Sequence, residues 1–80
     1  MKLSAYQIAL LNECSRYALD DVTGGFYRLG GHGKSPLRHN AASLRKLRLL
    51  GLVESGSVIR ATEFGKTTLF KLQRPANPAP

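Results

Sequence analysis

The sequence predicts an α+β domain that is mainly helical, with about three helices and a small antiparallel sheet. Apolar residues recur at helical spacing near the N-terminus and again over residues 36–50. After Gly51, short apolar pairs flank a Ser-Gly-Ser turn in the manner of a β-hairpin. The chain has 80 residues, enough for one domain with a small core. We therefore expect a single domain over residues 1–73, followed by a short tail.

The first helix is predicted to begin at Ser4 and to end near Leu19. Gln7 follows Ser4 at the spacing of a capping box, in which each side chain bonds the backbone N–H of the other residue. Cys14 falls on the apolar face of this helix and is expected to pack as a small apolar residue. The alternative is a reactive thiol, but no neighbour in the sequence would lower its pKa.

Asp20 and Asp21 come next and are predicted to begin a turn or to pair with a basic residue elsewhere, because acidic residues at the C-terminus of a helix oppose its dipole. A catalytic or metal-binding pair is the alternative, and no third ligand type lies near them in the sequence. Residues 23–35 are rich in glycine, which disfavours a second helix. Phe26 and Tyr27 instead favour a short strand, which we expect to pair with the hairpin in a three-stranded sheet.

The best-defined stretch is a helix predicted over residues 36–50. Pro36 suits the first helical position, where its missing N–H has no partner to lose, and Ser35 is the expected N-cap. A helical wheel turns an apolar stripe toward the core and leaves a polar, basic face outward. The inward residues are Leu37, Ala41, Leu44 and Leu47. Gly51 is expected to end the helix in a left-handed conformation.

The rest of the chain is predicted to form a hairpin, a last helix and a tail. Leu52-Val53 and Val58-Ile59 are the expected strands of the hairpin. Thr62 is the predicted N-cap of a final helix that ends at Gln73. Residues 74–80 are rich in proline and are expected to be disordered.

This order of elements carries a family resemblance. Leu44, Leu47 and the run Gly51-Leu52-Val53 look like the motif that closes the recognition helix of many bacterial winged-helix regulators. The run Ala61-Thr62-Glu63-Phe64-Gly65-Lys66 is similar to the "L-T-E-x-G-R" motif that follows the wing of MarR-type repressors. The resemblance covers roughly residues 37–70 and implies a winged helix-turn-helix fold. The glycine-rich segment stands where such proteins have their second helix.

The positive charge of the chain is concentrated in one region. The net charge is +7, and no acidic residue lies between Val22 and Val53. A basic stripe of this kind is the footprint expected for nucleic acid, with a solvated surface as the alternative. The basic residues in that span are Arg28, Lys34, Arg38, Arg45, Lys46 and Arg48.

Double-stranded DNA is the predicted partner, bound in its major groove by the recognition helix. Arginine can form a bidentate pair with guanine, and a small side chain such as Ala42 lets a helix approach the bases closely. Lys34 and Arg28 are expected to contact phosphates, which position a protein without reading sequence. Arg60 is the single basic residue of the hairpin, so the wing is expected to contribute little. The residues predicted to face the DNA from the recognition helix are Arg38, His39, Ala42, Ser43, Arg45 and Lys46.

Two other functions stay open. A small winged helix of phage or mobile-element type can act as a protein-interaction module, and its basic helix would then meet an acidic surface on the partner. RNA binding needs exposed aromatic rings for base stacking, and the candidates are Phe26, Tyr27 and Phe70. A homodimer would have to use the first or last helix, Leu49 and Leu50, or Phe70.

No enzyme activity, cofactor or metal site is predicted. His32 and His39 have no acid or nucleophile partner at a useful spacing, and with Cys14 they match no zinc-ligand pattern. Residues 31–35 read Gly-His-Gly-Lys-Ser, like the end of a phosphate-binding P-loop, but Arg28 occupies the place of the first glycine. A loop that touches a DNA phosphate and a plain loop are the remaining interpretations. The sequence has no apolar run of membrane-spanning length and no signal-peptide core at its start, so we expect a cytoplasmic protein.

Overall fold

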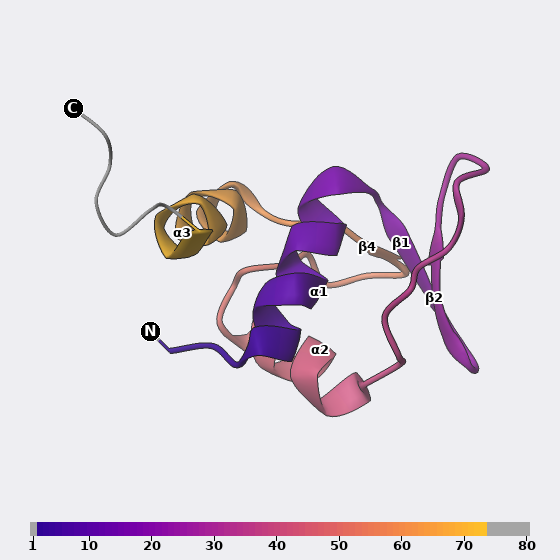
Figure 1. Cartoon of the computed structure of the whole chain (residues 1–80), viewed down its shortest axis with the longest axis horizontal. Coiled ribbons are helices and arrows are strands. Elements are labelled where there is room, and N and C mark those ends of the chain that lie inside the picture. Colours follow the sequence, from indigo (N-terminus) through magenta and orange to yellow (C-terminus); the bar gives the residue numbers. More distant parts are fainter. Residues whose placement is uncertain (1, 74–80) are drawn as a thin grey trace.

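A computed structural model of the chain describes residues 2–73, which form three helices and one four-stranded antiparallel sheet (Figure 1). The elements in chain order are α1 (Ala5–Arg16), β1 (Leu19–Val22), β2 (Gly25–Arg28), β3 (Gly33–Lys34), α2 (Ala41–Leu49), β4 (Val58–Ile59) and α3 (Glu63–Gln73). This confirms the predicted α+β class with helices predominating, and the element order is compatible with a winged-helix-like topology. The predicted disordered tail, residues 74–80, lies outside the described residues.

Helix α1 begins as the sequence predicts. The Ser4 hydroxyl accepts a hydrogen bond from the backbone N–H of Gln7 at 3.1 Å, and the Gln7 side chain accepts one from the backbone N–H of Ser4 at 2.9 Å. The capping box is therefore complete. The helix ends at Arg16 rather than near Leu19, because the backbone of Tyr17 is extended and leads into β1. This early exit places Leu19 on the sheet with its side chain fully buried.

Strand β1 contradicts the turn predicted at Asp20 and Asp21. Both residues pair with β2 in a hairpin, Asp20 opposite Tyr27 and Asp21 opposite Phe26. Successive side chains of a strand point to opposite faces. Asp21 therefore shares the inner face of the sheet with the buried Phe26, whereas Asp20 lies on the outer face. The turn comes later, at Gly24, whose φ of 90° is accessible to glycine without strain.

Strand β2 forms where the sequence predicts it, but its partners differ from the prediction. The sheet order is β3-β2-β1-β4, so β2 lies between β1 and β3, and β1 is the strand that pairs with β4. The expected three-stranded sheet is therefore wrong. The glycine-rich segment supplies two strands instead of one, because Gly30 and Gly31 take positive φ values of 82° and 83° and reverse the chain between β2 and β3.

Helix α2 begins at Ala41, not at the proline predicted to start it. Asn40 is the N-cap, and its side chain accepts a hydrogen bond from the backbone N–H of Ser43 at 3.0 Å. Ala41, which was expected to face the core, is exposed. Helix α2 is thus shorter than the helix predicted over residues 36–50.

The segments on either side of α2 are set by local contacts. Before the helix, the Ser35 hydroxyl accepts a hydrogen bond from the backbone N–H of Leu37 at 3.3 Å, which stabilises a turn rather than a helix cap. After the helix, Gly51 has a φ of 76° and ends α2 in the left-handed conformation that the sequence predicts.

The core lies between the helices and the inner face of the sheet, and α1 packs against both α2 and α3 (Figure 1). Leu44 and Leu47 are buried, which confirms the main part of the inward stripe predicted for α2. Full burial of one such side chain contributes about 1.5–3 kcal/mol, so this shared core is what places α2 relative to α1. The large side chains that are fully buried are Phe26, Leu10, Leu11, Leu19, Leu44, Leu47, Leu52 and Ile59.

The hairpin after α2 is less regular than predicted. Val53 forms an isolated bridge with Ala61, and Val58–Ile59 is the one segment of the hairpin that forms a strand, in the part of the chain that is described. Arg48 on α2 donates a hydrogen bond from Nη2 to the carbonyl oxygen of Gly56 at 3.1 Å. The tip of the hairpin is thereby held against the helix.

Helix α3 begins at the predicted cap, Thr62. The Thr62 hydroxyl accepts a hydrogen bond from the backbone N–H of Gly65 at 2.9 Å and donates one to the carbonyl oxygen of Gly51 at 2.7 Å. Gly65 is buried against Leu52, and a Cβ atom at this position would overlap the carbonyl oxygen of Leu52. Helix α3 therefore approaches the chain after α2 backbone to backbone, which glycine alone permits.

Candidate nucleic-acid interface

The outward face of α2 carries three of the residues predicted to contact DNA. Ala42, Arg45 and Lys46 are exposed and lie within one or two turns of each other, on the side opposite the buried Leu44 and Leu47. We call Ala42, Arg45 and Lys46 the basic face of α2. No acidic side chain of residues 2–73 forms an ion pair with Arg45 or Lys46. Both cations are therefore available to a ligand.

Ser43 and Arg38 lie at the margins of this face. Ser43 is half-buried, and its backbone N–H is used by the Asn40 cap. Arg38 precedes the helix rather than lying on it, and it is exposed. Its backbone carbonyl accepts a hydrogen bond from the hydroxyl of Tyr6 on α1, which leaves the guanidinium outside that contact.

His39 precedes α2, which corrects its predicted position on that helix. Its Nε2 atom lies 2.7 Å from Oδ1 of Asp21 on β1. The imidazole ring meets the ring of Phe26 edge to face, with the centroids 5.0 Å apart. His39 therefore links the start of α2 to the inner face of the sheet, because the helix begins after it and its ring turns inward.

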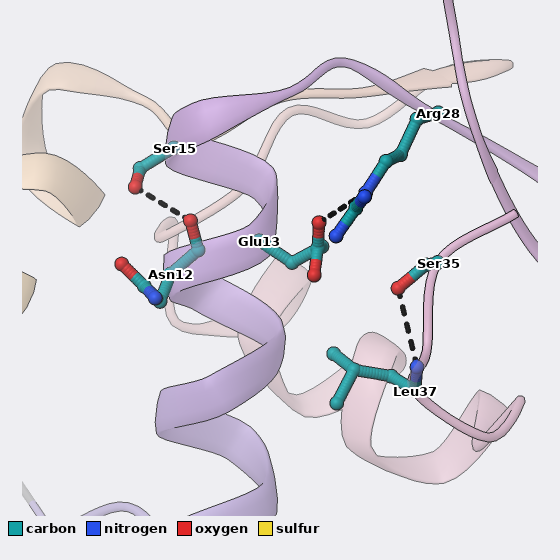
Figure 2. A network of polar contacts seen from close by, with 6 residues as sticks. All are labelled: Asn12, Glu13, Ser15, Arg28, Ser35 and Leu37. Carbon is teal, nitrogen blue, oxygen red and sulfur yellow. Dashed lines mark hydrogen bonds and ion pairs between the residues drawn. The ribbon is translucent and has the colours of Figure 1, made fainter. Parts of the chain in front are cut away.

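Arg28 is also occupied by contacts within the protein. Figure 2 shows its guanidinium reaching from β2 to Glu13 on α1, where Nε donates to Oε1 at 2.6 Å. The guanidinium carbon lies 4.3 Å from the ring centroid of Tyr17. The hydrogen bond that Arg28 donates to Glu13 raises the pKa of Arg28, which stays charged. The predicted phosphate contact by Arg28 would have to break this ion pair.

The two remaining predicted cations lie apart from the basic face of α2. Lys34 is exposed on β3, with its ammonium 5.9 Å from the ring centroid of Tyr27. Arg60 lies at a depression of about 290 Å³ that Arg16 and Lys66 also line, between the end of α1 and the start of α3. Arg60 therefore belongs to a different part of the surface from Arg45 and Lys46.

The hairpin turn offers no cation to a ligand. Residues 55–57 are Ser, Gly and Ser, and the exposed Glu54 stands beside them. Arg48, the nearest arginine, is half-buried and bonded to Gly56. That the wing adds little to nucleic-acid binding stays a prediction.

Other groups with potential chemistry are inert or dispersed. Burial raises the pKa of the Cys14 thiol to about 12, so it is protonated at neutral pH. No set of three or more His, Cys, Asp or Glu side chains in residues 2–73 is placed to hold a metal ion. None of the helices found in those residues has the length and apolar character needed to cross a lipid bilayer.

Sequence reasoning missed the residues that fix the start of α2. Tyr6 and Arg38 are separated by 32 positions in the chain, and Asp21 and His39 also come from distant segments. No spacing motif links such pairs, so no local signal could have identified them.

Comparison of the chain with protein-family models, with curated proteins and with solved structures finds no match.

Proposed function

We propose that this protein is a small winged-helix DNA-binding protein that places the basic face of α2 in the major groove. One observation carries the proposal: Arg45 and Lys46 project from the outer side of a helix whose other side is fixed in the core. An α-helix fits the major groove of B-form DNA, and rigid placement of its side chains is what base recognition requires.

Each residue of this surface has a distinct role in the proposal. Arg45 pairs with a guanine, for which a guanidinium is the best-matched side chain. Lys46 and Arg38 contact phosphates on either side of the groove, and Lys34 on β3 adds a further phosphate contact. Ala42 keeps the first turn of α2 narrow enough to approach the bases. Arg28 and His39 act from within the fold, by fixing the sheet and the start of α2.

A regulator of transcription in the cytoplasm is the biological setting that we propose. Regulators with this kind of helix commonly bind as dimers to two half-sites. A homodimer of this chain would use an apolar side chain that the fold leaves at the surface, such as Phe70 on α3, which is 67% exposed.

The test is fluorescence anisotropy with random-sequence duplex DNA at about 50 and about 200 mM salt. Each phosphate that is neutralised contributes about −0.9 to the log–log salt slope. Lys46, Arg38 and Lys34 are the three proposed phosphate contacts, and they therefore predict a slope of about −3. Arg45→Ala/Lys46→Ala should weaken binding and reduce the slope by about 1, because Lys46 is the phosphate contact that it removes. Lys66→Ala/Lys71→Ala removes the same charge from α3 and is the matched control.

If both double variants lose the same amount of affinity, the placement of α2 in the groove is refuted. The net charge of the protein would then explain the binding. The absence of binding at about 50 mM salt would refute DNA binding itself. If the native protein binds and the α2 variant binds more weakly than the control, a selection from random duplexes with the native protein should identify the sequence read by Arg45.

A protein partner with an acidic surface is the second candidate. It is favoured by Leu49, which is 80% exposed and follows Arg45 and Lys46 on the outer side of α2. An apolar side chain beside two cations suits a protein interface better than a phosphate backbone. Leu49→Ser should weaken such a complex in a pull-down while leaving duplex DNA binding unchanged.

A further inference from the structure

One face of the sheet, opposite the side that buries Phe26, is uncovered at Tyr27 on β2 and Lys34 on β3, which are both exposed. Figure 1 shows the three helices gathered to one side of the β1–β2 hairpin. The register places Asp20 opposite Tyr27 and Tyr27 opposite Lys34. Since opposed residues share a face, these three side chains form a row across β1, β2 and β3 on the uncovered side.

Within this row, a cation is held beside an exposed aromatic ring. Tyr27 is 44% exposed, and the Lys34 ammonium lies 5.9 Å from its ring centroid. Lys34 also lies across Gly25, since a Cβ atom at Gly25 would come within 2.8 Å of its Cε. Gly25 thus leaves room for the lysine stem to lie along the sheet rather than extend into solvent.

The other aromatic rings of the sheet and its surroundings are occupied. Phe26 is fully buried on the inner face. Tyr17 is covered by the Arg28 guanidinium on its ring, and His32 lies against it with centroids 5.3 Å apart. Among these rings, Tyr27 is the one that offers an open π-face with a positive charge next to it.

We propose that the uncovered face of the sheet binds one nucleotide of single-stranded nucleic acid. The base stacks on the Tyr27 ring, and its phosphate pairs with Lys34. Stacking on an aromatic ring beside a cation is the common chemistry of single-strand binding, and it tolerates any base. Asp20 flanks the ring on the side away from Lys34, so its carboxylate repels the phosphate and fixes the direction of the strand across the sheet. The site lies apart from the basic face of α2 and goes beyond duplex binding, and Lys34 is the one residue that it shares with the proposed duplex contacts.

The test uses a fluorescein-labelled oligothymidylate of ten nucleotides, with binding followed by anisotropy at low salt. Tyr27→Ala should weaken binding at least fivefold, whereas Tyr27→Phe, which keeps the ring, should bind within twofold of the native protein. Phe64→Ala removes an exposed ring from α3 and should have no effect. Lys34→Gln should lower both affinity and salt dependence, with Lys71→Gln as the charge-matched control.

An NMR titration of the native protein with the same unlabelled oligonucleotide gives a readout that needs no variant. A stacked base should move the Tyr27 ring protons upfield in a saturable way, with smaller changes at Tyr6 and Tyr17. Unshifted Tyr27 protons at saturation, or equal binding by Tyr27→Ala and native protein, would overturn the proposal. Duplex binding by Arg45→Ala/Lys46→Ala is measured in parallel. The proposals of single-strand binding at Tyr27 and of duplex binding at α2 can thus be refuted independently.

Discussion

Glu13 and Arg28 join the first helix to the second strand, with the arginine Nε donating to the glutamate Oε1 at 2.6 Å (Figure 2). The two side chains are only 10% and 23% exposed. Tyr17 adds a ring contact to the same guanidinium. The pair therefore sets the angle at which the β1–β2 hairpin leaves the helical part of the molecule.

Removal of one partner from this pair should be costly. Arg28→Met leaves the Glu13 carboxylate buried without its hydrogen-bond donor, and we expect the free energy of unfolding to fall by about 1–3 kcal/mol in urea denaturation. Glu13→Gln/Arg28→Met removes both charges and should recover at least half of that loss. A double variant as unstable as the sum of the two single variants would contradict the coupling between them.

The buried thiol predicts a loss of stability in alkaline solution. The pKa of Cys14 is raised by burial, and further by the neighbouring Glu13, from about 9.0 to about 12. The folded state therefore holds this proton more tightly than the unfolded chain. The stabilisation is complete below about pH 9 and is lost as pH rises toward about 12. Relative to Cys14→Ala, the native protein should lose about 2 kcal/mol between pH 8 and pH 11.

The comparison with Cys14→Ala separates this effect from the titration of lysine and tyrosine, which both proteins share. Parallel stability curves for the two proteins from pH 8 to pH 11 would contradict the raised pKa. Reaction of the native thiol with a disulfide reagent at neutral pH should also be slow, and it should become fast in denaturant.

Gly65 should tolerate no side chain. Gly65→Ala places a methyl group where the Leu52 carbonyl oxygen lies, so α3 must move away from the chain that follows α2. We expect a loss of at least about 2–3 kcal/mol, measured by thermal or urea unfolding. Thr67→Ala, at an exposed position of the same helix, is the control and should change stability by less than about 0.5 kcal/mol. A stable Gly65→Ala protein would mean that α3 does not pack on Leu52.

The start of α2 can be located by mutation. Asn40→Ala removes the side chain that caps the helix and should cost about 1 kcal/mol, whereas Asn40→Asp should be nearly neutral. The helix predicted from Pro36 would give a different result, since Asn40 would then lie in the second turn and its replacement by alanine would stabilise the helix. Urea denaturation of the two variants distinguishes these cases.

The sequence predicts best what depends on neighbouring residues. The capping box of Ser4 and Gln7, the left-handed Gly51 and the Thr62 cap are all confirmed because each needs only a few consecutive residues. Pro36 misled the prediction of the recognition helix, since a proline suits the first turn of a helix and a loop before it equally well. The choice is made by the Asn40 cap that follows.

Charged residues misled the sequence analysis where their partners are distant. Asp20 and Asp21 were predicted to begin a turn, but both residues pair with β2. Asp21 also meets His39, so the alternative of a basic partner applies to Asp21, but the sequence does not identify that partner. Arg28 was predicted to be a surface cation, but the packing of α1 places Glu13 beside it. These outcomes depend on contacts across the chain, which local propensity does not encode. On α2, by contrast, helical periodicity alone identified Ala42, Arg45 and Lys46 as outward residues.

The anchoring of α2 has an evolutionary consequence. The contacts that hold its start come from the hydroxyl of Tyr6, the carboxylate of Asp21 and the side chain of Asn40. None of these atoms belongs to Arg45 or Lys46, which can therefore be exchanged by mutation without disturbing the support beneath them. Mutations at the exposed positions of α2 can therefore change its proposed target while the fold is preserved. Libraries randomised at those positions should remain largely folded.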